Sequence, residues 1–382
     1  MRTFSGIIAA IATIAIGGAG VTLVRAAGVP AAAAAQNDPT ANPFVMRPGV
    51  VVDPAAGRLY MMNPQGGIDA VEIASGKLLW TTAAAAKPLA AYDHRLAAQA
   101  EQSRGSNGLP IALLDTRSGL VESTITVPAA SGAMPSINDG MGSSSTLEAS
   151  FGQQGLLIWW TLASREISGI LSAEPPPEHK NSGAALINLT THRVTILTAA
   201  QAAAKINSVR PSAKVPRLTG TEALYFLPQQ ADGFFVSLTL GPSDAGTPVT
   251  LRRWSANTRA PLPDVDLGHG YAAWAVSADN ACFLITKIAT GNVVGSTDYL
   301  WVIYALASGE RLADIRLAQP ATTFFVRNGL LVYSVTPRAL RRSGSWQRDP
   351  LQLRAVSLKS GDEIWRRTLR ETGYRGPTIP RP

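Results

Sequence analysis

Few side chains in this sequence are placed to do acid–base, nucleophilic or metal chemistry. Glu174 and Glu178 have the chemistry of a paired acid and base, but only prolines lie between them, and such a segment is a stiff, extended loop. The 4 histidines lie far apart without metal-ligand spacing, and no Gly-x-Ser-x-Gly string marks a nucleophilic serine. We therefore expect no catalytic residue, no metal site and no bound cofactor.

The cysteine count excludes two further kinds of site. One Cys leaves no intrachain disulfide and no Cys-based zinc site. Cys282 stands in the apolar run 281–285, which is typical of a small buried hydrophobe and not of an exposed nucleophile.

The elements that must position any site are short β-type runs in a repeating four-strand unit. The first copy comprises residues 49–54, 57–63, 68–74 and 78–82, and the last comprises 322–327, 329–336, 351–358 and 363–369. In these copies and the weaker ones between them, a tight turn joins the third and fourth strands, at Gly76, Gly119, His192, Thr258, Gly309 and Gly361. Glycine suits such turns because it adopts positive φ without strain. The pattern, with no helical period, predicts an all-β fold: a single β-propeller of four-stranded antiparallel blades.

The turn positions indicate six blades between residues 49 and 370. The two longest intervals, from 119 to 192 and from 192 to 258, leave room for a seventh. A propeller repeats its unit around a ring, so these copies belong to one domain.

Two of the copies carry a more specific string. Ala70-Val71 to Trp80 and Ala355-Val356 to Trp365 share the pattern Ala-Val-x-x-x-Ser-Gly-x-x-x-Trp. This string resembles the repeat of the PQQ-like, or quinoprotein-alcohol-dehydrogenase-like, β-propeller superfamily, and residues 52–60 are similar to the YVTN-type repeat. The resemblance implies that Trp80 and Trp365 dock each blade against the next.

Catalytic members of that superfamily hold pyrroloquinoline quinone (PQQ) above a vicinal Cys pair and bind calcium through Glu, Asn and Asp. This sequence has 1 Cys and no matching calcium constellation. The resemblance is therefore to a non-catalytic member, an exported binding or scaffold protein of the cell envelope. The alternative is a periplasmic PQQ-dependent oxidoreductase, or an accessory subunit of one.

The connections between second and third strands vary in length and open on one end of a propeller, together with the links between blades. They comprise residues 64–67, 103–110, 172–182, 241–248, 287–298 and 337–350, and the longest link is 129–145. Because loops carry function, we expect a protein or anionic partner to bind this end and the opposite end to be a bland rim. The candidate binding residues are Arg104, Glu178, His179, Arg338, Arg341, Arg342, Trp346 and Arg348. Trp346 beside Arg348 suits an interaction hot spot, although a loop anchor packed onto its blade would have the same composition.

The first residues predict export. An apolar run over residues 7–24 follows Arg2, so residues 1–35 are a signal peptide or an N-terminal membrane anchor. Residues 36–48, rich in Ala and Pro, are expected to be a tether. In either case the propeller is periplasmic or extracellular, and an anchor would keep it at the membrane.

The formal net charge of +8 is concentrated at the other end of the chain. From Arg338 onward there are 11 Lys or Arg and 4 Asp or Glu, which accounts for +7. The last blade and the basic, Pro-rich tail of residues 371–382 therefore favour contact with an anionic membrane or envelope polymer. The rest of the chain is nearly neutral, so we expect no nucleic-acid partner.

Overall fold

The structure, a computed structural model, describes the greater part of the expected propeller. The described residues are 42–101, 108–128, 143–165, 178–209, 224–229, 232–239, 248–289, 298–335, 337, 339–342 and 345–370. They all belong to one compact unit, Ala34–Pro382. The expected signal peptide or anchor, the first part of the tether, Arg104, Arg338 and the tail from residue 371 lie outside them.

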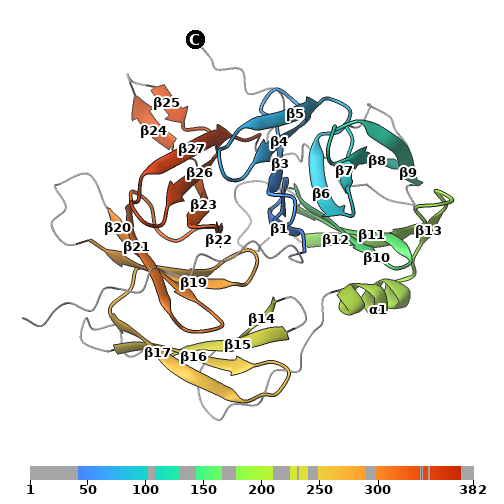
Figure 1. Cartoon of the computed structure of the whole chain (residues 1–382). Coiled ribbons are helices and arrows are strands. Elements are labelled where there is room, and N and C mark those ends of the chain that lie inside the picture. Colours follow the sequence, from blue (N-terminus) through green and yellow to red (C-terminus); the bar gives the residue numbers. More distant parts are fainter. Residues whose placement is uncertain are drawn as a thin grey trace, which may run out of the picture. The chain divides into compact units, whose positions relative to one another are not determined.

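Six antiparallel sheets follow one another along the chain, and the protein is an all-β, six-bladed β-propeller (Figure 1). Blade 1 contains β1 (Phe44–Arg47), β2 (Val50–Asp53), β3 (Arg58–Met62), β4 (Ile68–Glu72) and β5 (Leu78–Thr82). Blade 2 contains β6 (Lys87–Tyr92), β7 (Arg95–Gln99), β8 (Gly108–Asp115) and β9 (Val121–Pro128). Blade 3 contains β10 (Ser143–Gly152), β11 (Gly155–Arg165), β12 (Glu178–Ile187) and β13 (Val194–Ile196).

Blade 4 contains β14 (Leu224–Gln229), β15 (Asp232–Thr239), β16 (Pro248–Ser255) and β17 (Pro261–His269). Blade 5 contains β18 (Ala273–Val276), β19 (Cys282–Ile288), β20 (Tyr299–Ala305) and β21 (Arg311–Leu317). Blade 6 contains β22 (Phe324–Arg327), β23 (Leu330–Val335), β26 (Gln352–Ser357) and β27 (Glu363–Thr368). A separate hairpin of β24 (Ala339–Arg342) and β25 (Ser345–Arg348) is inserted between β23 and β26. Each blade is formed by one continuous stretch of chain.

The strands differ in burial according to their place in the blade. In β3 the four residues after Arg58 are fully buried, whereas three of the five residues of the outermost strand β5 are exposed. A short, continuous apolar run of the β3 kind is typical of a strand that is covered on both faces. In this protein the neighbouring blades supply the cover.

The core consists of apolar clusters shared by blades that follow one another. Such clusters join blades 1 and 2, blades 2 and 3, blades 4 and 5, and blades 5 and 6. A further cluster joins the last blade to the first, with Trp365 and Leu353 packed among Val71 and Ile73. The first and last blades, far apart in sequence, therefore share one core.

The tether ends earlier than the sequence indicated. Residues 44–47 were assigned to it, but they form β1, which pairs antiparallel with β2. Met46 is buried in the cluster of blades 1 and 6, and Phe44 contacts Phe325 with ring centroids 5.6 Å apart. Burial of these two apolar side chains explains why the stretch becomes a strand and not a tether.

The one described helix, α1 (Ala199–Val209), was also not expected. It begins with a capping box: the Thr198 hydroxyl accepts a hydrogen bond from the Gln201 amide at 3.3 Å, and the Gln201 side chain accepts one from the Thr198 amide at 3.0 Å. The string Thr-x-x-Gln before an Ala-rich run was a usable signal for this helix. Longer strands in blade 3 and this helix occupy the described parts of the two long intervals, where a seventh blade had been considered.

Candidate binding surfaces

Each blade presents two ends, which we define by their connections. The insertion end carries the links between second and third strands and the links between blades, and the turn end carries the third-to-fourth turns and the first-to-second turns. In blade 1, β2 to β5 are counted as the first to fourth strands, because β1 is an additional strand beside β2. The turns are short, as predicted: β4 and β5 are joined by residues 73–77, and β26 and β27 by residues 358–362. The connections at the insertion end vary in length: the second-to-third connections range from residues 63–67 in blade 1 to residues 336–351 in blade 6, and the links between blades range from residues 270–272 to residues 197–223.

The longest second-to-third connection carries five of the eight predicted binding residues. In the β24–β25 hairpin, Arg341 pairs with Trp346, and Ala339 pairs with Arg348. The hairpin thus brings Arg341, Arg342, Trp346 and Arg348 together on one small sheet at the insertion end of blade 6. We call this element the arginine hairpin.

Glu178 and His179 are placed differently from the prediction. They were assigned to a connecting loop, but they are the first residues of β12, paired with Arg165 and Ser164 of β11. The long β11–β12 ladder continues further than the hydrophobic pattern suggested, because polar residues can extend a strand beyond its buried part. These two residues belong to blade 3 and not to the blade of the arginine hairpin.

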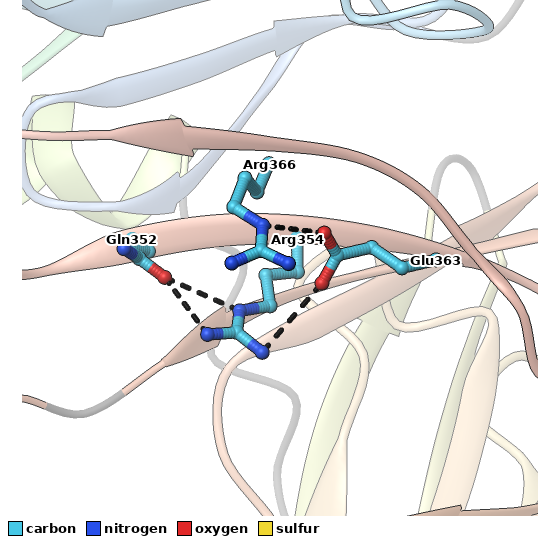
Figure 2. A network of polar contacts seen from close by, with 4 residues as sticks. All are labelled: Gln352, Arg354, Glu363 and Arg366. Atoms are coloured by element: carbon cyan, nitrogen blue, oxygen red, sulfur yellow. Dashed lines mark hydrogen bonds and ion pairs between the residues drawn. The ribbon is translucent and has the colours of Figure 1, made fainter.

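The charges of β26 and β27 are partly neutralised within the blade. Figure 2 shows Glu363 between two arginines, with Arg354 at 3.6 Å and Arg366 at 2.5 Å. Arg354 also donates to the side-chain oxygen of Gln352 at 3.0 and 3.2 Å. Two cations share one carboxylate, so this network keeps an excess positive charge, and Arg366 is 60% exposed. Exposed pairs of this kind contribute about 0–1 kcal/mol each.

Two other cations of the last blade fasten it to its neighbours. The Arg367 guanidinium donates to the carbonyl oxygen of Gly76 in blade 1, at 2.6 and 3.0 Å. The side chain of Arg370 is only 7% exposed and pairs with Glu101, which follows β7 of blade 2, at 2.5 Å. Part of the positive charge of this blade therefore serves internal contacts and is not presented to a partner.

Trp80 and Trp365, which were expected to dock blades, lie against the turn of the following blade. The Trp80 indole donates to Thr116 of blade 2 at 3.0 Å, and the Trp365 indole donates to Ile73 of blade 1 at 2.8 Å. Each ring covers the turn glycine: a Cβ atom added to Gly119 would lie 2.6 Å from Trp80, and one added to Gly76 would lie 2.5 Å from Trp365.

Arg253 of β16 makes the matching contact between blades 4 and 5. Its guanidinium donates to the carbonyl oxygens of Ala307 at 3.1 Å and Pro263 at 2.8 Å, and also to Leu306 and Ser308. A Cβ atom on Gly309 would lie 2.6 Å from this guanidinium. Sequence reasoning missed Arg253, which is 1% exposed. The sequence does not distinguish it from its neighbour Arg252, which is 42% exposed in the same strand.

Two hollows are present in the described part of the molecule. One, of about 840 Å³, is lined mainly by β1, β6 and β10, the innermost strands of blades 1 to 3. Tyr92 and Phe151 stack at its wall with centroids 6.1 Å apart. The other, of about 780 Å³, lies at the turn end of blades 6 and 1.

The described residues contain no group of three or more His, Cys, Asp or Glu that could hold a metal ion. Cys282 is buried, and burial, followed by the nearby Asp279, raises the pKa of its thiol. Burial of this kind makes a thiol inert. A membrane-crossing helix would have to be longer and more apolar than any that the structure describes.

Neither a family model nor a curated protein matches this chain. Among solved structures it is similar to dihydro-heme d1 dehydrogenase NirN in complex with DHE, at 11% identity over 86% of this chain and 67% of that chain, with a TM-score of 0.31. It is similar to the computationally designed Ika8 protein at 9% identity over 90% of this chain and 91% of that chain, with a TM-score of 0.30. A eukaryotic initiation factor matches at 10% identity over 84% and 87%, with a TM-score of 0.36.

Likeness at these scores carries no argument about activity. The assignment to the β-propellers rests on the protein's own six sheets, and the finer resemblance to the PQQ-like superfamily stays a prediction.

Proposed function

We propose that this protein is an exported, non-catalytic β-propeller of the PQQ-like type, which works as a binding or scaffold protein of the cell envelope. The partner is a protein, and it binds the insertion end. The observation that carries the proposal is the difference between the two ends of the blades. The turns at one end are uniformly short, whereas the connections at the other end vary in length, and one of them forms the arginine hairpin. A rigid scaffold with variable loops on one end is the usual arrangement of a binding protein.

The arginine hairpin is the part of this end that best suits recognition. Arginine and tryptophan are the residues most enriched in interaction hot spots, and β24 and β25 hold Arg341 and Trp346 at paired positions. A small paired sheet also loses less conformational freedom on binding than an open loop would. We assign the hairpin the main role in partner binding, with Arg104, Arg338, Glu178 and His179 as further candidates.

Affinity capture from envelope extracts of the source cells tests this assignment. The variant R341E/R342E reverses two charges at the insertion end, and K77E/K359E reverses two charges at the turn end as a matched control. We expect proteins captured by the wild type and by the control to be lost with R341E/R342E. Capture of the same proteins by all three forms would contradict binding through the hairpin.

The excess positive charge of the last blade supports a second, weaker contact with an anionic membrane or envelope polymer. Each cation near an anionic surface contributes about 1 kcal/mol, which salt screens. Co-sedimentation with vesicles of phosphatidylglycerol and phosphatidylcholine should therefore fall steeply between low and high salt, and a flat salt dependence would contradict this contact.

A further inference from the structure

One sequence motif has no role in the proposed function. Asn188-Leu189-Thr190 is the one string in the sequence with the pattern Asn-x-Ser/Thr in which x is not proline. This pattern is the acceptor site for N-linked glycans in secreted proteins. Because a glycan is bulky and hydrated, such a site has to lie on the surface of the folded protein.

The motif meets this condition, because it lies on the surface at the turn end of blade 3. It begins the turn of residues 188–193, which joins β12 to β13. Asn188 and Thr190 are both exposed, whereas Ile187, the residue before them, is fully buried in the apolar cluster of blades 2 and 3. A glycan on Asn188 would therefore extend into solvent without displacing the core.

Hydrogen bonds fix the orientation of the Asn188 side chain. Its Oδ1 atom accepts hydrogen bonds from the backbone amides of Thr190 at 3.0 Å and Thr191 at 2.8 Å. Both partners are donors, so the oxygen of the carboxamide and not its nitrogen faces them. The Nδ2 atom, to which an N-linked glycan is attached, is therefore directed away from these two amides. Replacement of one of its hydrogens by a sugar leaves both hydrogen bonds to Oδ1 intact.

Blade 2 shows that a turn of this kind does not require asparagine. Asp115 begins the corresponding turn, and its Oδ1 atom accepts hydrogen bonds from the amides of Arg117 at 3.0 Å and Ser118 at 2.8 Å. The backbone amides of Asp115 and Asn188 also donate alike, each to the carbonyl oxygen five residues later, at 2.9 and 3.0 Å. One side-chain oxygen thus serves the turn in both blades. The carboxamide nitrogen of Asn188 is an additional group, which the turn does not need.

We propose that Asn188 is an N-glycosylation site of this protein, an inference that rests on the proposed export. The donor is an oligosaccharide linked to a polyprenyl diphosphate of the export membrane. In the transfer, the bond from Nδ2 to C1 of the first sugar forms, and the bond from C1 to the diphosphate oxygen breaks. Free polyprenyl diphosphate is the leaving group, and Nδ2 loses one proton to a base. Asn188 lies at the turn end, so the glycan leaves the arginine hairpin at the insertion end open to a partner.

Mass spectrometry of the full-length protein, purified from its source cells in separate exported and cytoplasmic fractions, tests this proposal. Trypsin releases residues 181–193 as one peptide, and peptide-N-glycosidase in heavy-oxygen water converts a glycosylated asparagine into labelled aspartate. We expect the label on Asn188 in the exported fraction and none on Asn181, which has Gly183 in the third position. T190A should lose the glycan, whereas T190S should keep it, because transfer requires a hydroxyl at the third position.

Circular dichroism melting separates a lost glycan from a lost fold. Thr190 donates to Asn188 through its backbone amide, and N188D retains the acceptor oxygen that Asp115 supplies in blade 2. T190A and N188D should therefore melt like the deglycosylated wild type. Exported protein with an unmodified Asn188 would overturn this inference and leave the proposed function intact. Protein confined to the cytoplasm, with Asn188 unmodified, would overturn both.

Discussion

The junction between blades 6 and 1 and the junction between blades 4 and 5 solve the same packing problem with different chemistry. At the first, Trp365 covers Gly76 and donates one hydrogen bond to Ile73. At the second, Arg253 covers Gly309 and donates to several carbonyl oxygens of blades 4 and 5. What the fold requires at this place is a flat group that can donate to a turn carbonyl, and an indole and a guanidinium both qualify.

The two solutions differ in where their stabilisation originates. Trp365 contributes mainly buried apolar area, whereas Arg253 contributes charge-assisted hydrogen bonds at the cost of burying a cation. Burial lowers the pKa of Arg253, and Asp264 opposes that shift. The Trp junction should therefore suffer most from truncation, and the Arg junction should suffer less because its removal also relieves a desolvation cost.

The largest effect is expected for Trp365→Ala. The substitution leaves a cavity beside Gly76 and removes the hydrogen bond to Ile73, so the free energy of unfolding should fall by about 3–5 kcal/mol. Urea denaturation monitored by circular dichroism measures this loss. Trp365→Phe, which keeps an aromatic ring but no donor, should lose less. A change below about 1 kcal/mol for the alanine variant would show that the first and last blades do not depend on this side chain.

Arg253→Met comes next, with an expected loss of about 2–3 kcal/mol. Met retains the aliphatic length, but the buried carbonyl oxygen of Leu306 and the partly buried ones of Ala307 and Pro263 lose their donor, and each such loss costs up to about 1–3 kcal/mol. Relief of the buried charge offsets part of the total. Arg252→Met is the control, since Arg252 is 42% exposed and its 3.7 Å contact with Asp264 is an ordinary surface pair. Equal losses for the two variants would remove the special role of Arg253.

The difference between these junctions also shows what could be predicted from the sequence. The turn glycines and short apolar runs predicted the blades because both follow from local backbone and burial requirements. Trp80 and Trp365 were visible because they recur at one spacing in a repeat. Arg253 was not, since an arginine in a strand ordinarily indicates exposure.

The two ends of the molecule also differ in how much of their structure could be predicted from the sequence. The arginine hairpin was expected from an insertion rich in arginine, although its pairing was not. The hollow at the turn end is lined in part by Leu79 and Ile364, the extra residues of two β-bulges, and a bulge is a property of strand register that hydrophobic patterning does not reveal. The helix α1 was missed although its capping box is present in the sequence.

Substitution of the turn glycines tests the contacts at the blade junctions, with a smaller expected effect on stability. Gly119 and Gly361 have similar φ, 72° and 76°, so alanine strains the backbone equally at both. At Gly119, however, the new methyl group would lie 2.6 Å from the Trp80 ring, whereas the nearest atom at Gly361 is 3.7 Å away, on Ile315. We expect Gly119→Ala to lower the free energy of unfolding by about 2 kcal/mol more than Gly361→Ala. Equal losses for the two variants would show that the Trp80 ring moves away from the new methyl group at no cost in free energy.

The smallest effect concerns Tyr60, which stacks on Trp80 at the junction of blades 1 and 2 with centroids 5.8 Å apart. Burial, followed by the charge of Asp53, raises the pKa of this phenol to about 12. The unfolded chain releases the proton near pH 10, so the stability that depends on the neutral phenol is fully present below that pH. It is lost as pH rises through 12.

At pH 11 the loss due to Tyr60 should be about 1.4 kcal/mol, because one pKa unit corresponds to about that free energy. Denaturation at pH 8 and pH 11 of the wild type and of Tyr60→Phe measures it. The phenylalanine variant should lose less stability between the two pH values, since it has no proton to release, and an identical loss in both forms would assign the alkaline sensitivity to other groups. The raised pKa values of Tyr304 and Tyr333 also have burial as their main cause, so the Tyr60→Phe variant should retain a weaker alkaline sensitivity from these two residues.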